Sequence, residues 1–180
     1  MPVRILIIVS SCVLMFLMGC QPTPKTAGEK LDMSTAVDRA LSHFRSDSKA
    51  SKFFADAYGW AVFPQVTRGA VLLGASNGQG EVYRAGQKVG YATVTSVTVG
   101  AQVGGQTYAE IVFFQNKKAF TTFTSNQLTG QASAGAVAGD QGELDVADYS
   151  RGVAIFTANN SGLIVAADIG GQKFMYEPMD

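Results

Sequence analysis

The chain has 180 residues, of which 47% are hydrophobic and 16% are charged, and its formal net charge at neutral pH is zero. This composition excludes a disordered chain and a basic nucleic-acid-binding tail, and it suits one domain with a sizeable core. The charges are unevenly spread, with nine Lys/Arg and six Asp/Glu in residues 21–88 against four and eight in residues 89–180.

Residues 1–19 are predicted to be a bacterial signal peptide. Arg4 gives a short positive start, and an apolar run of 14 residues follows from Ile5 to Met18. A bilayer span needs roughly 20 apolar residues, so the run fits a signal peptide better than a permanent span. It ends in LMGC, which resembles a lipobox. We therefore expect Cys20 to carry acyl chains such as palmitate; a plain signal peptide or an uncleaved anchor is the alternative.

Residues 20–33 are predicted to be the lipidated cysteine and a flexible tether, because Pro22 and Pro24 lie in a polar stretch. The residue after the cysteine is Gln21, not the Asp that resembles an inner-membrane retention signal. This favours the bacterial outer membrane, on its periplasmic face. The tether is expected to leave the domain at its positive end and to hold that end near the bilayer.

Residues 34–180 are predicted to form the domain, which begins with helices. Ser34 is expected to cap a helix whose apolar positions Val37, Leu41 and Phe44 share one face. A second short helix is expected from Ala50 until Gly59 stops it.

The pattern then changes to strands. Strands are predicted at residues 60–63, 70–73, 81–83, 91–102, 108–114, 132–137, 153–158, 163–168 and 173–176. Pro64 is expected to halt the first strand, and residues 77–80 and 86–90 are expected to form turns. One more helix is expected to start at Asn116. These elements predict an α+β fold: an antiparallel, curved or barrel-like β core with two N-terminal helices and one internal helix. Trp60 and Phe63 are expected to be buried.

Residues 58–69 have the sequence YGWAVFPQVTRG, and residues 97–104, 113–123 and 149–152 follow in order. These segments resemble the SYLF domain, a lipid-binding module of bacteria and eukaryotes, and residues 58–69 resemble its start. The resemblance covers roughly residues 34–178. It implies phospholipid binding, because eukaryotic members bind phosphoinositides. Yeast relatives bind and bundle actin, which has no counterpart in a periplasm.

The sequence gives little support for a catalytic site or a metal site. His43 is the sole histidine, and no activated nucleophile pairs with it in the sequence. No cysteine follows Cys20, so a zinc site is nearly excluded. We expect no enzymatic activity, no cofactor and no metal.

Basic side chains are the candidate headgroup ligands. They are Arg39, Arg45, Lys49, Lys52, Arg68, Lys117, Lys118 and Arg151. In an unbroken helix residues 45, 49 and 52 would be aligned, and Arg68 and Arg151 are expected to precede equivalent strands. An ordinary solvated surface, or pairing with carboxylates, explains them equally well. The predicted function is a membrane-anchored periplasmic lipoprotein that binds anionic phospholipid. The alternative is an envelope structural or protein-interaction lipoprotein; the sequence leaves the oligomeric state open.

Overall fold

The computed structural model describes residues 23–71, 73–99, 106–128, 149, 151–159, 162–164 and 172–179. At residues 68–71, 73–75, 97–99, 106 and 162–164 the backbone alone is described. The predicted signal peptide, Cys20 and the predicted strand at 132–137 lie outside the described residues. None of the helices in the described ranges is long and apolar enough to cross a membrane.

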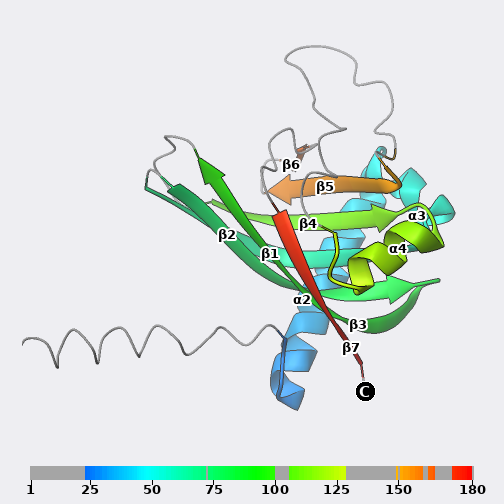
Figure 1. Cartoon of the computed structure of the whole chain (residues 1–180), viewed down its shortest axis with the longest axis horizontal. Helices are drawn as coiled ribbons and strands as arrows, with labels where there is room; N and C mark the ends of the chain where they lie inside the picture. The colour runs from blue at the N-terminus through cyan, green and yellow to red at the C-terminus, as the bar shows by residue number, and fades with distance from the viewer. Residues whose placement is uncertain are drawn as a thin grey trace, which may run out of the picture.

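An antiparallel sheet forms the centre of the molecule (Figure 1). Its described strands are β1 (Gly59–Val71), β2 (Leu73–Arg84), β3 (Gln87–Val99), β4 (Gln106–Phe114), β5 (Val153–Asn159), β6 (Gly162–Ile164) and β7 (Gln172–Pro178). Their order is β6-β5-β4-β1-β2-β3-β7, and every neighbouring pair is antiparallel. The strands predicted at 91–102, 108–114, 153–158, 163–168 and 173–176 correspond to β3 to β7.

The sheet is strongly curled. Three strands separate β4 from β7, which would place these strands about 19 Å apart in a flat sheet. Yet Gln172 of β7 donates a hydrogen bond to Glu110 of β4 over 2.9 Å. The rings of Phe63 in β1 and Phe174 in β7 are also only 5.9 Å apart. In Figure 1, β7 accordingly crosses in front of the central strands. We call the concave side, which carries these residues, the inner face, and the other side the outer face.

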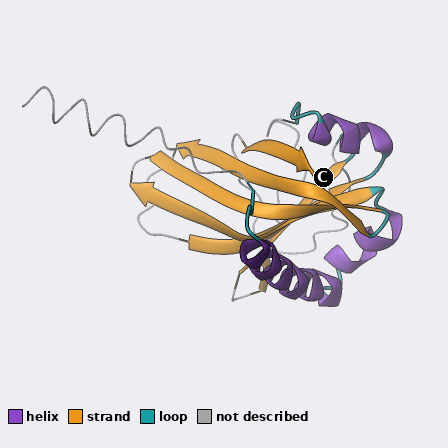
Figure 2. Ribbon diagram, turned by 90° about the horizontal axis from the view of Figure 1, so that it is seen from below, coloured by secondary structure: helices purple, strands orange, loops and turns teal. Residues whose placement is uncertain are grey.

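Helices cover both faces of the sheet, and each face has its own core. α2 (Ala27–Ser46), η1 (Ala50–Lys52) and α3 (Phe53–Asp56) pack on the outer face, where α2 is the longest helix in Figure 2. α4 (Lys117–Thr124) packs on the inner face. Along β1, Trp60 faces the outer core and Phe63 the inner core, and both are buried as predicted. The predicted α+β fold with a curved antiparallel sheet is confirmed.

The first helix begins earlier than predicted. Thr26, not Ser34, is its N-cap: the Thr26 hydroxyl accepts a hydrogen bond from the Glu29 backbone N–H over 3.2 Å. The Glu29 carboxylate accepts one in return from the Thr26 N–H over 2.9 Å. This reciprocal pair is a capping box. Residues 27–33, which were expected to belong to the tether, are therefore helical.

Two predicted stops lie inside strands. β1 continues through Pro64, where the register with both neighbouring strands shifts and forms a bulge. The glycines at 78 and 80 lie within β2, and a Cβ atom on Gly80 would collide with the carbonyl oxygen of Val62. The turn expected at 77–80 is therefore wrong. The turn between β2 and β3 instead uses Ala85 and Gly86, whose φ angles are +49° and +77°.

Candidate functional site

One end of the sheet is marked by residues in register on four adjacent strands: Arg84 of β2, Gly59 of β1, Phe114 of β4 and Val153 of β5. Basic residues lie on this row or close to it in sequence. We call them the basic end: Lys49, Lys52, Arg84, Lys117, Lys118 and Arg151. All six side chains are exposed.

Contacts between distant segments hold the basic end together. Phe53, which follows Lys52, packs on Tyr149 with ring centroids 5.0 Å apart. The Gln115 backbone N–H donates to the Gly152 carbonyl over 2.9 Å, so the turn that carries Arg151 lies against the start of α4. The helical segments of the outer face and α4 of the inner face thus meet at this end of the sheet.

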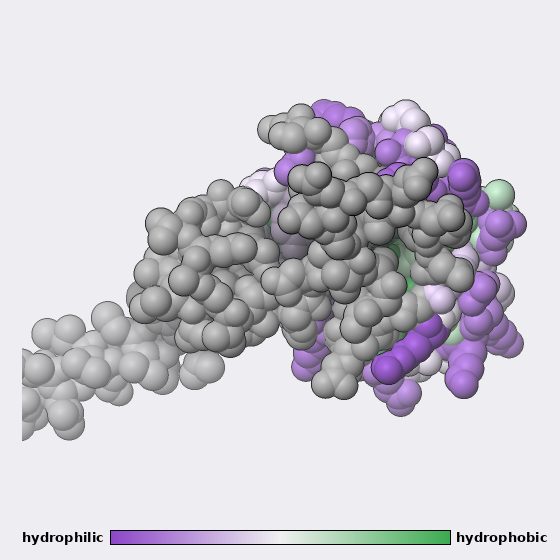
Figure 3. Space-filling model, turned by 90° about the horizontal axis from the view of Figure 1, so that it is seen from above, coloured by the Kyte–Doolittle hydropathy of each residue, from purple (hydrophilic) through white to green (hydrophobic). Residues whose placement is uncertain are grey.

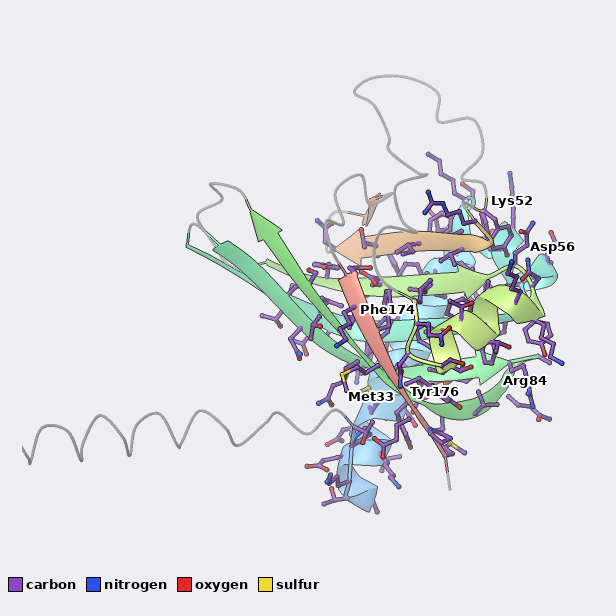
Figure 4. All side chains as sticks on the ribbon, in the orientation of Figure 1. Met33, Lys52, Asp56, Arg84, Phe174 and Tyr176 are labelled. Atoms are coloured by element: carbon purple, nitrogen blue, oxygen red, sulfur yellow. The ribbon has the colours of Figure 1, made fainter. Side chains whose placement is uncertain are left out.

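The basic end is poor in compensating charge. Figure 4 places Lys52 and Arg84 at the same end of the molecule, with Asp56 between them. Within the described part of the chain, the side chains of Lys52, Arg84, Lys117 and Lys118 form no ion pair. In Figure 3, the described atoms at this end are mainly hydrophilic. The basic end is therefore a solvent-exposed surface with positive charge.

Lys117 and Lys118 occupy an unfavourable place for helix stability. They begin α4, where the partial positive charge of the helix dipole repels cations. The helix is held instead by Asn116, whose side chain accepts a hydrogen bond from the Ala119 N–H over 3.0 Å, and by buried Phe120 and Phe123. The structure thus confirms Asn116 as the helix start, and the side chains of the two lysines have no hydrogen-bond or ion-pair partner among the described residues.

The remaining sequence candidates lie elsewhere. Arg68 lies within β1, in register with Gln106, whereas Phe114 at the other end of β4 marks the basic end. Eight residues of strand separate these positions, about 27 Å. Arg151 instead precedes β5, in a turn with a φ of +53°. The structure therefore does not bring Arg68 and Arg151 together, and they do not precede equivalent strands.

The chain breaks between the two predicted N-terminal helices, so Arg45, Lys49 and Lys52 do not form the row that an unbroken helix would give. α2 ends at Ser46, and the Asp47 carboxylate accepts hydrogen bonds from the backbone N–H groups of Lys49 (2.8 Å) and Ala50 (2.9 Å). The Arg45 guanidinium lies 5.0 Å from the centre of the Phe54 ring, so it is engaged in a cation–π contact.

Grooves flank α2 on the outer face. Arg39 and His43 line one of about 780 Å³ together with Gln65, Tyr108 and Asn159, and its described lining contains no carboxylate. The other, of about 810 Å³, is lined by Lys25, Glu29 and Asp32 among others and is therefore mixed in charge. Arg39 is thus separate from the basic end.

Tether and basic end lie at opposite ends of α2. The helix begins at Ala27 and has 20 residues, so its ends are about 30 Å apart. Lys49 and Lys52 follow its C-terminal end. The expectation that the tether leaves the domain beside these basic side chains is therefore wrong.

A buried polar cluster on the outer face was not predicted from the sequence. Glu81 accepts hydrogen bonds from Ser34 (2.7 Å), Tyr83 (2.6 Å) and Lys88, and the Lys88 pair at 2.9 Å is an ion pair. Burial, and then the hydrogen bond to Glu81, raises the pKa of Tyr83. Burial alone would lower the pKa of Lys88, but Glu81 outweighs it and the pKa is raised. Ser34 therefore joins α2 to the sheet.

Arg84 is the basic-end residue that sequence reasoning missed. The sequence feature that could have indicated it is its position before Ala85 and Gly86, which form the turn at the end of β2. The strand register was needed to show that this turn lies beside the start of α4.

Comparison with known proteins relates the chain to one family. Residues 95–178 match the family described as Ysc84, Las17-binding protein actin regulator. This match runs from β3 to β7 and includes Lys117, Lys118 and Arg151. Beta cell expansion factor A of Aeromonas veronii is 30% identical over 154 residues, which cover 84% of this chain. The chain spans 59% of the length of that relative.

Proposed function

From the membership of residues 95–178 in the Ysc84 family, whose domain is SYLF, we propose that this protein is a membrane-associated, non-enzymatic lipoprotein that binds anionic phospholipid. The family resemblance of the sequence is confirmed, and it supports a lipid-binding or actin-regulator-like domain. Phospholipid and not actin is the proposed partner, because the predicted export places the domain outside the cytoplasm.

The observation that carries the proposal is the basic end. Four cations from three segments of the chain, Lys52, Arg84, Lys117 and Lys118, are presented at one end of the sheet and form no ion pair with the described residues. Each basic group near an anionic leaflet contributes about 1 kcal/mol. Several together give weak, salt-dependent adhesion, since exposed charges are screened beyond about 8 Å at physiological ionic strength.

Vesicle cosedimentation tests the basic end. In a chain that starts at Gln21, reversal of Lys52, Lys117 and Lys118 to Glu should weaken binding to anionic vesicles on the order of a hundredfold, since three favourable terms are lost. Arg45 is left intact because of its contact with Phe54. The matched control reverses Lys25, Lys30 and Lys173, which are exposed away from the basic end and change the net charge equally.

Two results would contradict the proposal. Equal binding by the two variants would mean that net charge, not the basic end, governs adhesion. If the wild-type chain does not bind anionic vesicles at low salt, phospholipid is excluded as the ligand. The second candidate, a protein partner in the envelope, is then favoured.

The proposed anchor is Cys20, after removal of residues 1–19, in the outer membrane facing the periplasm. The support is the sequence LMGC at residues 17–20 and the Gln21 that follows it. Cys20→Ser should give an unprocessed chain without acyl groups, measured by intact-mass spectrometry of the membrane fraction. A mature N-terminus at another residue, without acyl chains, would refute the anchor and leave the basic end to be tested separately.

A further inference from the structure

The inner face contains buried polar side chains far from the basic end. Glu110 of β4 is fully buried, and it lies in register with Phe63 of β1 and with buried Thr157 of β5. Across the curl of the sheet it meets Gln172 of β7, which is 1% exposed. Polar groups at such depth need hydrogen-bond partners, and an ionised carboxylate needs them most.

The hydrogen bonds between these two side chains are incomplete. Gln172 Nε2 donates to Glu110 Oε2 over 2.9 Å. The other oxygens, Glu110 Oε1 and Gln172 Oε1, are both buried and have no hydrogen-bond partner among the described residues. Both are acceptors if Glu110 is ionised, so neither satisfies the other. One proton on the carboxyl group changes this, because a carboxylic acid donates through its O–H while its carbonyl oxygen accepts.

We propose that Glu110 is a neutral carboxylic acid in the folded protein, and that it forms a two-hydrogen-bond acid–amide link with Gln172 that joins β4 to β7. Interchange of the amide oxygen and nitrogen of Gln172 leads to the same conclusion, because either arrangement satisfies both groups only with a proton on the carboxyl. Loss of the proton removes one hydrogen bond and leaves a buried charge.

Electrostatics agrees with the geometry. Burial raises the pKa of Glu110 to about 7, and the hydrogen bond from Gln172 lowers it by less. No charged residue in the described part of the chain contributes to this shift. The described side chains that share its surroundings are neutral: Phe63 from β1, Thr157 from β5 and Gln172 from β7. Among the charged residues of these strands, Lys173 and Glu177 are exposed, and Arg68 is in register with Gln106, four residues away along β4.

The link has a consequence for the curl of the sheet. β7 is held on one side by its ladder with β3, and the Glu110–Gln172 link ties it across the interior to β4. The acid form is favoured by folding, so its stabilisation is complete below about pH 4.5, the ordinary Glu pKa, and is lost as the pH rises to about 7. The attachment of β7 should therefore weaken near neutral pH.

Glu110→Gln provides the direct test. A glutamine at this position donates through its amide to Gln172 Oε1 and so imitates the protonated acid at every pH. In urea unfolding of the full chain in mild detergent, Glu110→Gln should match wild type at pH 4 and have a higher midpoint at pH 8. Hydrogen exchange in residues 172–178 at pH 8 should be slower in Glu110→Gln than in wild type, with no difference at pH 4.

The matched control is Glu81→Gln. Glu81 is also buried, but its carboxylate is ion-paired with Lys88, so the amide should lower the unfolding midpoint at pH 8. Carbon-13 NMR of the glutamate carboxyl groups gives an independent readout, since the signal absent from Glu110→Gln should titrate near pH 7. Titration near the ordinary Glu pKa of 4.5 would overturn the proposal. A pH-independent difference between wild type and Glu110→Gln would also overturn it.

Discussion

At the scale of single residues, Phe63 is one of the largest fully buried side chains of the inner core. It is fully buried on the inner face and packs against Phe174, while β2 provides the space with a glycine at position 80. Phe63→Ala would leave a cavity that a curled sheet, fixed on both sides of β1, closes poorly. We expect a loss of about 3–5 kcal/mol in the free energy of unfolding, measured by urea denaturation.

Leu31→Ala is the control for this measurement. Leu31 is 69% exposed on α2, so its truncation should change the free energy of unfolding by less than about 0.5 kcal/mol. Similar midpoints for the Phe63 and Leu31 variants would mean that the inner core is not packed around Phe63.

Two buried glutamates show how the same side chain takes different roles. Glu81 has three hydrogen-bond donors, including a lysine, whereas Glu110 has one amide donor. The sequence shows each glutamate only as a polar residue in a predicted strand region. Their partners, Ser34 and Gln172, lie 47 and 62 residues away in the chain, so local pattern reasoning had no means of finding them.

At the scale of elements, the start of α2 depends on a local signal that the sequence contains. Thr26 and Glu29 have the spacing of a capping box. Thr26→Ala should lower the free energy of unfolding by about 1 kcal/mol, measured by thermal denaturation monitored by circular dichroism.

Thr35→Ala is the matched control for Thr26→Ala, because its hydroxyl only bonds the Leu31 carbonyl inside the same helix. An equal effect of the two changes would contradict a capping role.

Hydrogen bonds from the backbone of Thr26 and Lys25 lower the pKa of Glu29. The contribution of its carboxylate is therefore present above the ordinary Glu pKa of 4.5 and is lost as the pH falls below it.

Elements with strong local patterns were predicted well, and those shaped by distant strands were not. Val153–Asn159 and the helix that Asn116 caps follow from their own residues. The predictions that Pro64 ends a strand and that residues 77–80 form a turn were wrong for a different reason. The bulge in β1 and the close approach of Gly80 to Val62 arise from strand pairing, which residue type does not reveal.

The same argument applies to the candidate site. Lys52, Lys117, Lys118 and Arg151 were chosen as basic residues, but their meeting at one end depends on the register of β1, β4 and β5. Arg39, Arg45 and Arg68 were equally plausible by residue type. The structure distinguishes them, because Arg39 lines a groove beside α2, Arg45 contacts the Phe54 ring, and Arg68 is in register with Gln106 at the other end of β4.

At the scale of the whole molecule, the long helix relates the proposed anchor to the proposed binding surface. The chain from Cys20 to Thr26 reaches at most about 20 Å, and α2 adds about 30 Å before Lys49. A domain held at one end of this helix and bound through the other must lie with α2 along the bilayer. This orientation keeps the sheet close to the surface instead of standing it upright.

The entry into α2 is also fastened to the last strand. The Thr23 hydroxyl donates to the Glu177 carboxylate over 2.8 Å, and the Met179 N–H donates to the Val89 carbonyl over 3.1 Å. The beginning and the end of the described domain are therefore spatial neighbours. A short linker can join them in a circularly permuted chain that opens at the exposed Ala85-Gly86 turn, with the curled sheet retained. A reporter fused after Met179 would, for the same reason, lie beside the end of the domain that carries the proposed anchor.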